Sequence, residues 1–487
     1  MLQFMERLKI RSRIILSLIV ILSVFSSCKD EEETTPPANN KPDPELAKNI
    51  AINNWIKAVM EEAYFWLEDM KTPIANTARP ESYFESFLFK PTDRFSAIYP
   101  NYQELISSLS GVSTESGYEI SLLRESESNE NVIALITYVK KGSPAASNDL
   151  RRGDLISQIN GSTMTLNNYQ SLLRERSNQH SVTFRRPDEA GQFGAPQTVT
   201  LAAIQIEENP NFLDSIYVID NQKIGYVVYH FFAPGVNNPT TNQMDTRYDA
   251  EMDEIFAKFK AENINQLIID FRYNGGGYVS SAVNLASLIV PNFNSDKIFS
   301  KTKYNSFLSR FPTFQNIQTK FKEKSENIGN QLADGKIYIL TSSRTASASE
   351  LIINGLKPYL NVVIIGAKTT GKNVGSVALE DEDNPDNNYG LLPIVTKSFN
   401  SLDQSDYGDG FIPDEEISEF QFFPWRDFGD VRDPLLKSAL DKITGTSTPG
   451  ARLKLEDRIM IGSSLDSKIR SGVMLEDNSN FKNYREK

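Results

Sequence analysis

The sequence contains few of the residues that form disulfides and metal sites. Its 487 residues include a single cysteine, Cys28, and only two histidines, His180 and His230. One cysteine excludes an internal disulfide framework and a thiolate-rich zinc site. Two histidines leave little room for a metalloenzyme, so we expect no metal and no other cofactor.

Basic residues are also in deficit. The chain has 51 lysines and arginines against 63 aspartates and glutamates, which gives a net charge of -12. This balance argues against a protein that binds nucleic acid through a general basic surface. The length predicts about three domains, each with its own core. It does not indicate an oligomeric state.

The N-terminus has the pattern of a secretory signal. Basic residues precede an apolar run, Ile14 to Phe25, which at 12 residues is too short to cross a bilayer. Two serines then precede Cys28. This resembles a bacterial lipoprotein lipobox, in which the cysteine is acylated, although Phe25 stands where such sites usually carry Leu. The alternative is an ordinary signal peptide with a buried cysteine. We expect a signal peptide over 1–27, lipidation at Cys28 and a disordered tether over 28–44.

The residues after Cys28 bear on location. Cleavage before Cys28 would leave a net charge of -15. Lys29 to Glu33 resembles the surface-export signal of Bacteroidota-type lipoproteins, and it also suits a solvated tether. The resemblance implies a protein of the cell envelope that is lipid-anchored to the outer membrane. It would face either the periplasm or the cell surface.

The region after the tether is predicted to be helical. Over residues 45–110, Trp55, Val59, Ala63 and Trp66 recur at three- and four-residue spacing. We interpret this aromatic stripe as the core of an N-terminal domain and assign no chemistry to it.

Residues 111–206 contain the stretch KKGSPAASNDLRRGDLISQINGSTM. Gly142 to Ala145 predicts a turn that opens a short helix, Asp154 to Ile159 alternates as a strand, and Asn160-Gly161 is a strong hairpin signal. The stretch resembles the centre of a PDZ domain, a module that binds peptide C-termini as an added strand. The alternative is a PDZ-like domain that only shields or positions. The resemblance implies a carboxylate-binding loop at Gly117, Tyr118, Glu119 and Ile120.

From Lys223 onward, strands alternate with helices. Apolar strands are predicted at 224–229, 266–270, 336–341 and 362–366, with amphipathic helices between them. This order predicts a largely parallel sheet covered by helices. The expected fold class is therefore α/β, with a core over 207–444, an inserted PDZ-like, mostly β domain and a helical N-terminal region. The polar tail, 445–487, receives no function.

Three stretches follow predicted strands, where such folds place active sites. They are Asp270 to Gly277, Arg344 to Glu350 and Thr369 to Gly375. The third overlaps GAKTTGKN, which is one residue short of a nucleotide-binding P-loop. Its last residue, Asn373, lacks the hydroxyl that would ligate magnesium, and extended residues follow instead of a helix. We therefore set nucleotide binding aside.

A serine in the second stretch would need a base to act as a nucleophile. One possibility is a Ser-His-Asp triad through His230. The other is Lys372, because a desolvated lysine loses its charge and can then accept a proton. Ser347 and Lys372 are 25 residues apart, joined by helix, strand and turn, so both can lie at the same end of the sheet. Ser349 is the rival nucleophile.

The ordered set of motifs resembles the carboxyl-terminal processing peptidases, serine enzymes with a Ser–Lys dyad and an embedded PDZ domain. The likeness spans about residues 45–442 and implies a crotonase/ClpP-like core. The shared motifs are D-x-R-x-N-x-G-G at 270–277, S-A-S-E at 347–350, Gly-Lys at 371–372, G-F-I-P-D at 410–414 and Asp433-Pro434.

The resemblance implies a role for individual residues. Ser347 would attack the scissile carbonyl and neutral Lys372 would take its proton; the family's 25-residue spacing favours Ser347 over Ser349. The helix that begins near Ser347 favours developing negative charge. The oxyanion hole would consist of backbone N–H groups of Ala348 and of Gly276 or Gly277.

Two positions depart from the family. Ser376 stands where some members carry a longer polar residue that supports the lysine, and Pro358 stands where some carry Asp. We expect a serine endopeptidase that cleaves proteins or peptides, with the PDZ-like segment capturing or gating the substrate C-terminus. Its partners would be these substrates and, through the lipid anchor, a membrane. The alternative is a catalytically inactive lipoprotein that binds peptides or apolar ligands on the same fold.

Overall fold

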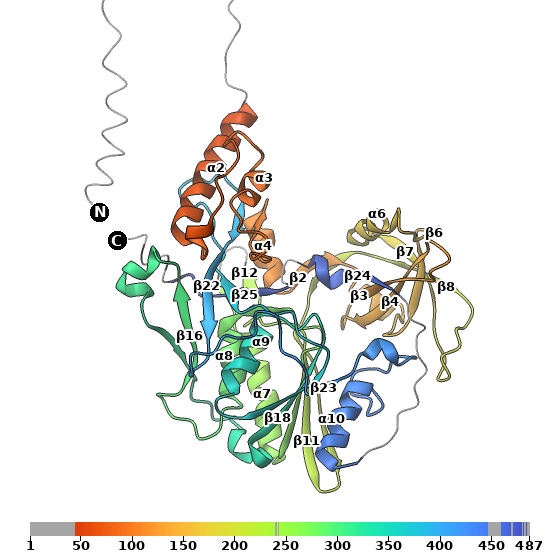
Figure 1. The fold of residues 1–487 in the computed structure, drawn as a ribbon. Coiled ribbons are helices and arrows are strands. Elements are labelled where there is room, and N and C mark those ends of the chain that lie inside the picture. The colour runs from red at the N-terminus through yellow and green to blue at the C-terminus, as the bar shows by residue number, and fades with distance from the viewer. Residues whose placement is uncertain are drawn as a thin grey trace, which may run out of the picture.

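The structure is a computed structural model that describes residues 44–238, 241, 243–446, 459–468, 471–479, 481 and 484. The predicted signal peptide, Cys28 and all of the predicted tether but its last residue lie outside the described residues. Figure 1 shows a helical N-terminal region, a β-rich domain and a larger α/β core. Across the described stretches, no helix has both the length and the apolar character needed to cross a membrane.

A six-stranded sheet forms the centre of the core, and all four predicted strands belong to it. The two strands at one edge are antiparallel, and all other neighbours are parallel. In spatial order the strands are β10 (Asn211–Ile219), β11 (Gln222–Tyr229), β14 (Gln266–Asp270), β18 (Lys336–Thr341), β19 (Asn361–Gly366) and β23 (Glu415–Glu416).

Helices cover both faces of this sheet. Three of them pack on one face: α7 (Arg247–Ala261), α8 (Val279–Ser287) and α9 (Ala348–Leu356). The other face is covered by α10 (Pro434–Thr444). Successive residues of a strand point to opposite faces, so Leu267 and Ile269 of β14 contact the first layer, whereas Ile268 contacts the second. Burial on both faces explains the nearly continuous apolar strands of the sequence, and the predicted α/β class is confirmed.

The β-rich domain has the predicted local features. The stretch GSPA opens α5 (Pro144–Ser147), and Asn160-Gly161 joins two strands with φ of 50° and 73°. Two positive φ angles are what a type I′ hairpin turn requires. The antiparallel sheet contains β3 (Tyr118–Arg124), β4 (Val132–Val139), β5 (Leu155–Ile159), β6 (Ser162–Thr163), β7 (His180–Arg185) and β8 (Gln197–Leu201). β2 (Val112–Glu115) and β9 (Ile204–Glu207) form a separate pair beneath it.

The N-terminal region reaches the core through a strand. It contains α2 (Pro44–Ala63), α3 (Pro80–Glu85), β1 (Ala97–Tyr99) and α4 (Tyr102–Leu109), and β1 pairs with β21 (Gly390–Leu392). Of the predicted stripe, Val59 and Ala63 are buried in this region, whereas Trp55 and Trp66 are partly buried and pack against the same cluster.

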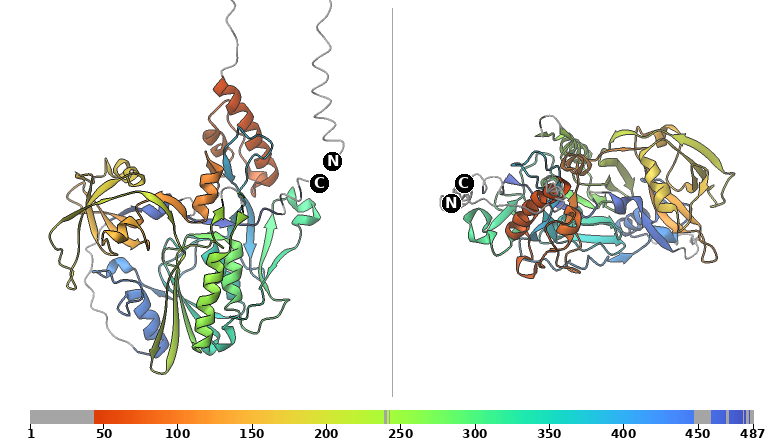
Figure 2. Two further views of the ribbon diagram at one scale, coloured as in Figure 1. Left: turned by 180° about the vertical axis from the view of Figure 1, so that it is seen from behind. Right: turned by 90° about the horizontal axis from the view of Figure 1, so that it is seen from above.

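The C-terminal tail supplies strands to two different sheets, which its sequence did not indicate. β24 (Met460–Ser463) pairs antiparallel with β3 of the β-rich domain. β25 (Val473–Leu475) lies inside a second six-stranded sheet, between β15 (Gly276–Tyr278) and β20 (Val374–Ser376). Figures 1 and 2 show the tail passing from the β-rich domain to the centre of the molecule. The sheet continues with β22 (Ile394–Phe399), β16 (Ile298–Tyr304) and β17 (Ile317–Lys320).

A buried arginine joins two motifs that are far apart in the sequence. The Arg272 guanidinium donates two parallel hydrogen bonds to Asp433, at 2.8 and 2.7 Å, and its Nε donates to Asp270. It also donates to Glu419, which Arg152 of the β-rich domain binds at 2.7 Å. Paired carboxylates compensate the burial of the cation. The network fixes the loop after β14 against the start of α10.

We predict that Asp433→Ala lowers the free energy of unfolding by about 3–5 kcal/mol, because it leaves a buried guanidinium without its bidentate partner. Urea unfolding of the purified chain measures the change. Asp296→Ala is the matched control, since it removes an exposed carboxylate from a surface pair with Lys320 and should have little effect. Equal losses in the two variants would contradict the role of the network.

Candidate active site

Ser347 occupies a strained turn between β18 and α9. It is the N-terminal cap of α9, it is fully buried, and its φ is +65° with ψ at -116°. A non-glycine residue in such a conformation costs about 1–3 kcal/mol and persists only where its surroundings hold it. Strained strand-to-helix turns are known to present nucleophilic serines.

The surroundings that hold Ser347 centre on the buried carboxylate of Glu350. One oxygen accepts the backbone N–H groups of Ser347 and Lys372, each at 2.8 Å. The other accepts the Gly371 N–H at 2.7 Å and the Thr369 hydroxyl at 2.6 Å. Burial raises the pKa of Glu350, and these four donors oppose that rise. A single side chain thus fixes the backbone of both predicted dyad residues.

Lys372 lies in a desolvated pocket. Its side chain is 1% exposed, and its Nζ lies 4.8 Å from the centre of the Phe95 ring. Burial lowers the pKa of Lys372 to about 7, although Asp93 and Glu350 act in the opposite direction. The N-terminal region therefore forms part of this pocket, a contribution that the sequence did not reveal. Near neutral pH, much of Lys372 is the free amine that a general base must be.

The two predicted dyad side chains are not joined to each other. Ser347 Oγ makes no hydrogen bond within the described part of the chain. Lys372 Nζ instead donates to the backbone carbonyl of Gly472, at 2.5 Å. The acceptor belongs to the C-terminal tail, immediately before β25. The structure therefore brings Ser347 and Lys372 to one place, with a tail carbonyl bound to the lysine.

The predicted oxyanion loop lies beside Ser347. A methyl group added to Gly276 would lie 2.9 Å from Ser347 Oγ, so only glycine leaves room there. The Gly276 N–H donates to the side chain of Asn274 at 2.9 Å. Ala348 begins α9 and is buried. Gly277 lies against Phe232, whose N–H donates to the Gly276 carbonyl.

The remaining candidates have other surroundings. Ser376 is buried on β20, and no hydrogen bond joins it to Lys372 among the described residues. The Ser349 hydroxyl donates to the Asn274 carbonyl at 3.2 Å. The His230 ring lies among aromatic rings, 4.1 Å from the ring centre of Tyr138 and 4.5 Å from that of Phe212. No hydrogen bond joins it to Ser347 Oγ in the described residues, and Glu350, which binds the backbone of Ser347 and Lys372, ties the serine to the lysine instead.

The predicted carboxylate-binding residues surround a buried acidic cluster. The oxygens of Glu115, Glu119 and Glu208 lie close enough together to hold a cation. The ammonium of Lys140 lies among them, 3.1 Å from Glu119 and 2.6 Å from Glu208. The Ile120 N–H donates to the Ser464 hydroxyl of the tail. Gly117 has a φ of +84° and packs against Ser143. The Tyr118 hydroxyl is hydrogen-bonded to His180 Nε2 at 2.9 Å.

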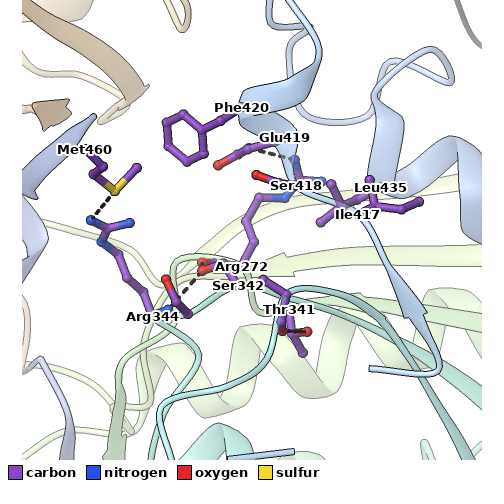
Figure 3. Close-up of a pocket in the computed structure, with 12 residues that line it drawn as sticks. Arg272, Thr341, Ser342, Arg344, Ile417, Ser418, Glu419, Phe420, Leu435 and Met460 are labelled. Carbon is purple, nitrogen blue, oxygen red and sulfur yellow. Dashed lines mark hydrogen bonds and ion pairs between the residues drawn. The ribbon is translucent and has the colours of Figure 1, made fainter. Parts of the chain in front are cut away.

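A cavity of about 180 Å³ lies beside the turn that leads to Ser347. Its walls include Arg272 and Glu419 of the buried network and Ser342 to Arg344 of the turn. Arg344 extends from the core toward Met460 of the tail, with 3.6 Å between its Nη2 and the sulfur (Figure 3). The tail thus closes one side of this cavity.

Comparison with known proteins agrees with this architecture. Residues 223–417 match the profile of peptidase family S41, residues 51–97 that of the peptidase S41 N-terminal domain, and residues 135–186 that of the PDZ domain. A structure from Bacteroides fragilis whose protein is assigned to the S41 proteases is 26% identical, with a TM-score of 0.68 over 81% of this chain and 98% of that one.

Two curated relatives share the name "Probable CtpA-like serine protease". The protein of Staphylococcus saprophyticus is 22% identical over 286 residues, and that of Staphylococcus epidermidis is 24% identical over 291. Each match covers 58% of this chain and 50% of the relative. The chain therefore spans about half the length of these relatives.

The helical region, the PDZ domain and the α/β core each match one of the three family profiles. The chain belongs to peptidase family S41. The predicted family resemblance is confirmed, whereas the individual site residues stay predictions.

We predict that Glu350→Gln destabilises the protein by about 1–3 kcal/mol. The NH₂ group of glutamine would replace one carboxylate oxygen, and the two donors that this oxygen now accepts would face another donor. Thermal unfolding measures this. The control is Glu323→Gln, the same change at an exposed position, which should leave stability unchanged. Matching stabilities for all three proteins would show that Glu350 does not hold the turn.

Proposed function

We propose that the protein is a serine endopeptidase in which Ser347 is the nucleophile and Lys372 the general base. The observation that carries this proposal is the shared scaffold: one buried carboxylate, Glu350, binds the backbone of both residues. The lowered pKa of Lys372 supports the assignment, because a lysine of ordinary pKa would be charged and unable to accept a proton at neutral pH.

The proposed reaction follows from these positions. Ser347 Oγ attacks the scissile carbonyl carbon, and its proton passes to the Lys372 amine. The resulting ammonium returns the proton to the leaving amine when the peptide C–N bond breaks. Water then attacks the acyl-enzyme, again with Lys372 as the proton acceptor, and releases the acid product and free Ser347.

Backbone donors would stabilise the tetrahedral intermediates. The Ala348 N–H lies at the start of α9, where the helix dipole favours negative charge. We assign the second donor to Gly277 in preference to Gly276, because the Gly276 N–H already donates to Asn274. Preorganised donors of this kind each contribute a factor of about 10²–10³ to the rate.

The PDZ domain would capture or gate the substrate in this proposal. β3 pairs with β4 on one side and with β24 of the tail on the other, next to Gly117 to Ile120, so a peptide strand would add there in place of β24. The proposed location rests on the sequence alone: cleavage before Cys28 and acylation of its thiol would anchor the protein in the cell envelope.

Ser376 is four residues after Lys372 in the sequence, and we propose that it supports the lysine during turnover.

We predict that Ser347→Ala and Lys372→Ala each lower the rate of casein cleavage by about 10³-fold or more, while circular dichroism stays unchanged. Ser349→Ala discriminates between the two serines and should keep most of the activity. Cleavage that survives in Ser347→Ala, or that disappears in Ser349→Ala alone, would refute the assignment of the nucleophile. An absence of cleavage in every protein, together with peptide binding, would favour the inactive binding protein.

The pH dependence should follow the ionisation of Lys372. Only the free amine can accept the serine proton, so kcat/KM should rise about tenfold per pH unit below pH 7 and level off above it. The rate of labelling by a fluorophosphonate probe, which forms a bond to Ser347 Oγ, should show the same profile. Lys372→Arg stays protonated throughout and should abolish the dependence. A midpoint near 10 would mean that Lys372 is not desolvated during reaction.

A further inference from the structure

The C-terminal tail binds the PDZ domain in the manner of a peptide ligand. β24 adds to the edge of β3, with Ser463 directly opposite Ser121. The Ser463 hydroxyl donates to the Ile120 carbonyl at 2.8 Å, and the Ile120 N–H donates to the Ser464 hydroxyl at 2.9 Å. Strand addition at a sheet edge is how PDZ domains hold peptides. A peptide that used this edge would need the place of β24.

A lysine of the tail enters the acidic cluster of the PDZ domain. Lys468 Nζ lies 2.7 Å from Glu115 and 3.0 Å from Glu119. Both carboxylates are buried and also contact Lys140. Without Lys468, the carboxylates of Glu115 and Glu119 would share the Lys140 ammonium with Glu208. Removing one partner from buried ion pairs is strongly unfavourable, so the charges favour the docked tail.

The next part of the tail fills the space between β15 and β20, which we call the groove. β25 runs parallel to β15 and to β20, between the oxyanion loop and the strand that follows Lys372. A methyl group built on Gly276 would lie 2.5 Å from the Val473 carbonyl oxygen and 2.9 Å from Ser347 Oγ. The tail backbone and the nucleophile therefore converge on the same small space.

The tail also engages the proposed base. The Gly472 carbonyl accepts a hydrogen bond from Lys372 Nζ, while Ser347 Oγ lacks a partner among the described residues. Both side chains are almost completely buried. A substrate carbonyl cannot reach a serine in that state. The groove must first lose its occupant.

Beyond the groove, the tail is anchored a second time. Phe481 is buried in the hydrophobic cluster that joins the N-terminal region to the core, with ring centres 5.2 Å from Phe314 and 6.1 Å from Tyr304, both of the core. The tail contacts with Lys372 and Gly276 therefore lie between two anchored points, the PDZ domain and this cluster.

We propose that the tail, through residues 459–468 and 471–476, is the resident ligand of one peptide-binding surface, formed by the β3 edge, the Glu115–Glu119 pair and the groove between β15 and β20, and that it holds the peptidase inactive until it is displaced. This rests on the proposed function. The surface takes an extended internal segment with a lysine in the acidic cluster. A displacing peptide is expected to have the same chemistry.

The first test weakens the anchor in the PDZ domain. Lys468→Glu should raise the rate of casein cleavage and of fluorophosphonate labelling by about 5- to 150-fold, the range of ordinary coupling between sites. Lys468→Arg keeps the charge and should remain close to wild type. Lys320→Glu is the matched charge reversal, at an exposed lysine on β17 whose ammonium pairs with the exposed Asp296, and it should have no effect.

The second test locks the tail in place. In the full chain carrying Cys28→Ser, the pair Ser121→Cys and Ser463→Cys places two thiols at directly opposed positions of the β3–β24 ladder, where strand spacing allows a disulfide. Oxidation should suppress cleavage and labelling, and reduction should restore them. Each single cysteine variant should ignore the oxidant.

The outcomes separate this inference from the proposed function. Each measurement is repeated with Ser347→Ala, and activity that does not depend on Ser347 would refute the proposed function itself. If activity depends on Ser347 but Lys468→Glu does not raise it, or the oxidised lock does not lower it, the inhibitory tail is refuted. Intact-mass analysis that finds Ser347-dependent cleavage within 459–476 of the wild type would also refute it, because the tail would then be a substrate.

Discussion

The arrangement of the site depends on one buried carboxylate. Glu350 binds the backbone N–H groups of Ser347 and Lys372 through a single oxygen, and so ties a strained turn on one strand end to a loop on the next. Neither residue needs to contact the other for this tie to hold. The positive φ of Ser347 is sustained in the same way, since its N–H is one of the groups that Glu350 accepts. In the proposed dyad, the desolvation that lowers the pKa of Lys372 would supply the free amine, while Glu350 holds the backbone of both residues.

Local patterns of the sequence predicted much of the fold. Runs such as QLIID and KIYILT are apolar on both faces, and both became interior strands of a mostly parallel sheet. Asn160-Gly161 predicted its hairpin because two positive φ angles suit few other residue pairs. The spacing of Ser347 and Lys372 was informative because helix, strand and turn between them return the chain to one sheet end. These signals depend on neighbours in the sequence, which a single chain displays.

The unpredicted features are contacts between distant segments. The sequence placed Glu350 in the S-A-S-E motif but did not predict its hydrogen bonds, because its partners Thr369 and Gly371 follow it only after a helix and a strand. Asp93 and Phe95 reach Lys372 from the N-terminal region. The tail was the largest omission. β24 and β25 span four and three residues, too short for a periodic pattern, and their pairing partners lie more than 95 positions away.

The place of β25 inside a sheet has a consequence for solubility. Removal of β25 would leave the backbone of β15, and that of Ser376 on β20, without the strand that now pairs with it. An unpaired strand edge can hydrogen-bond to any extended chain, including a second copy of the same protein, and natural sheets protect their edges for this reason. A resident strand keeps both edges saturated while no substrate is present. By filling this position in the sheet, β25 would protect the protein against aggregation through these strands.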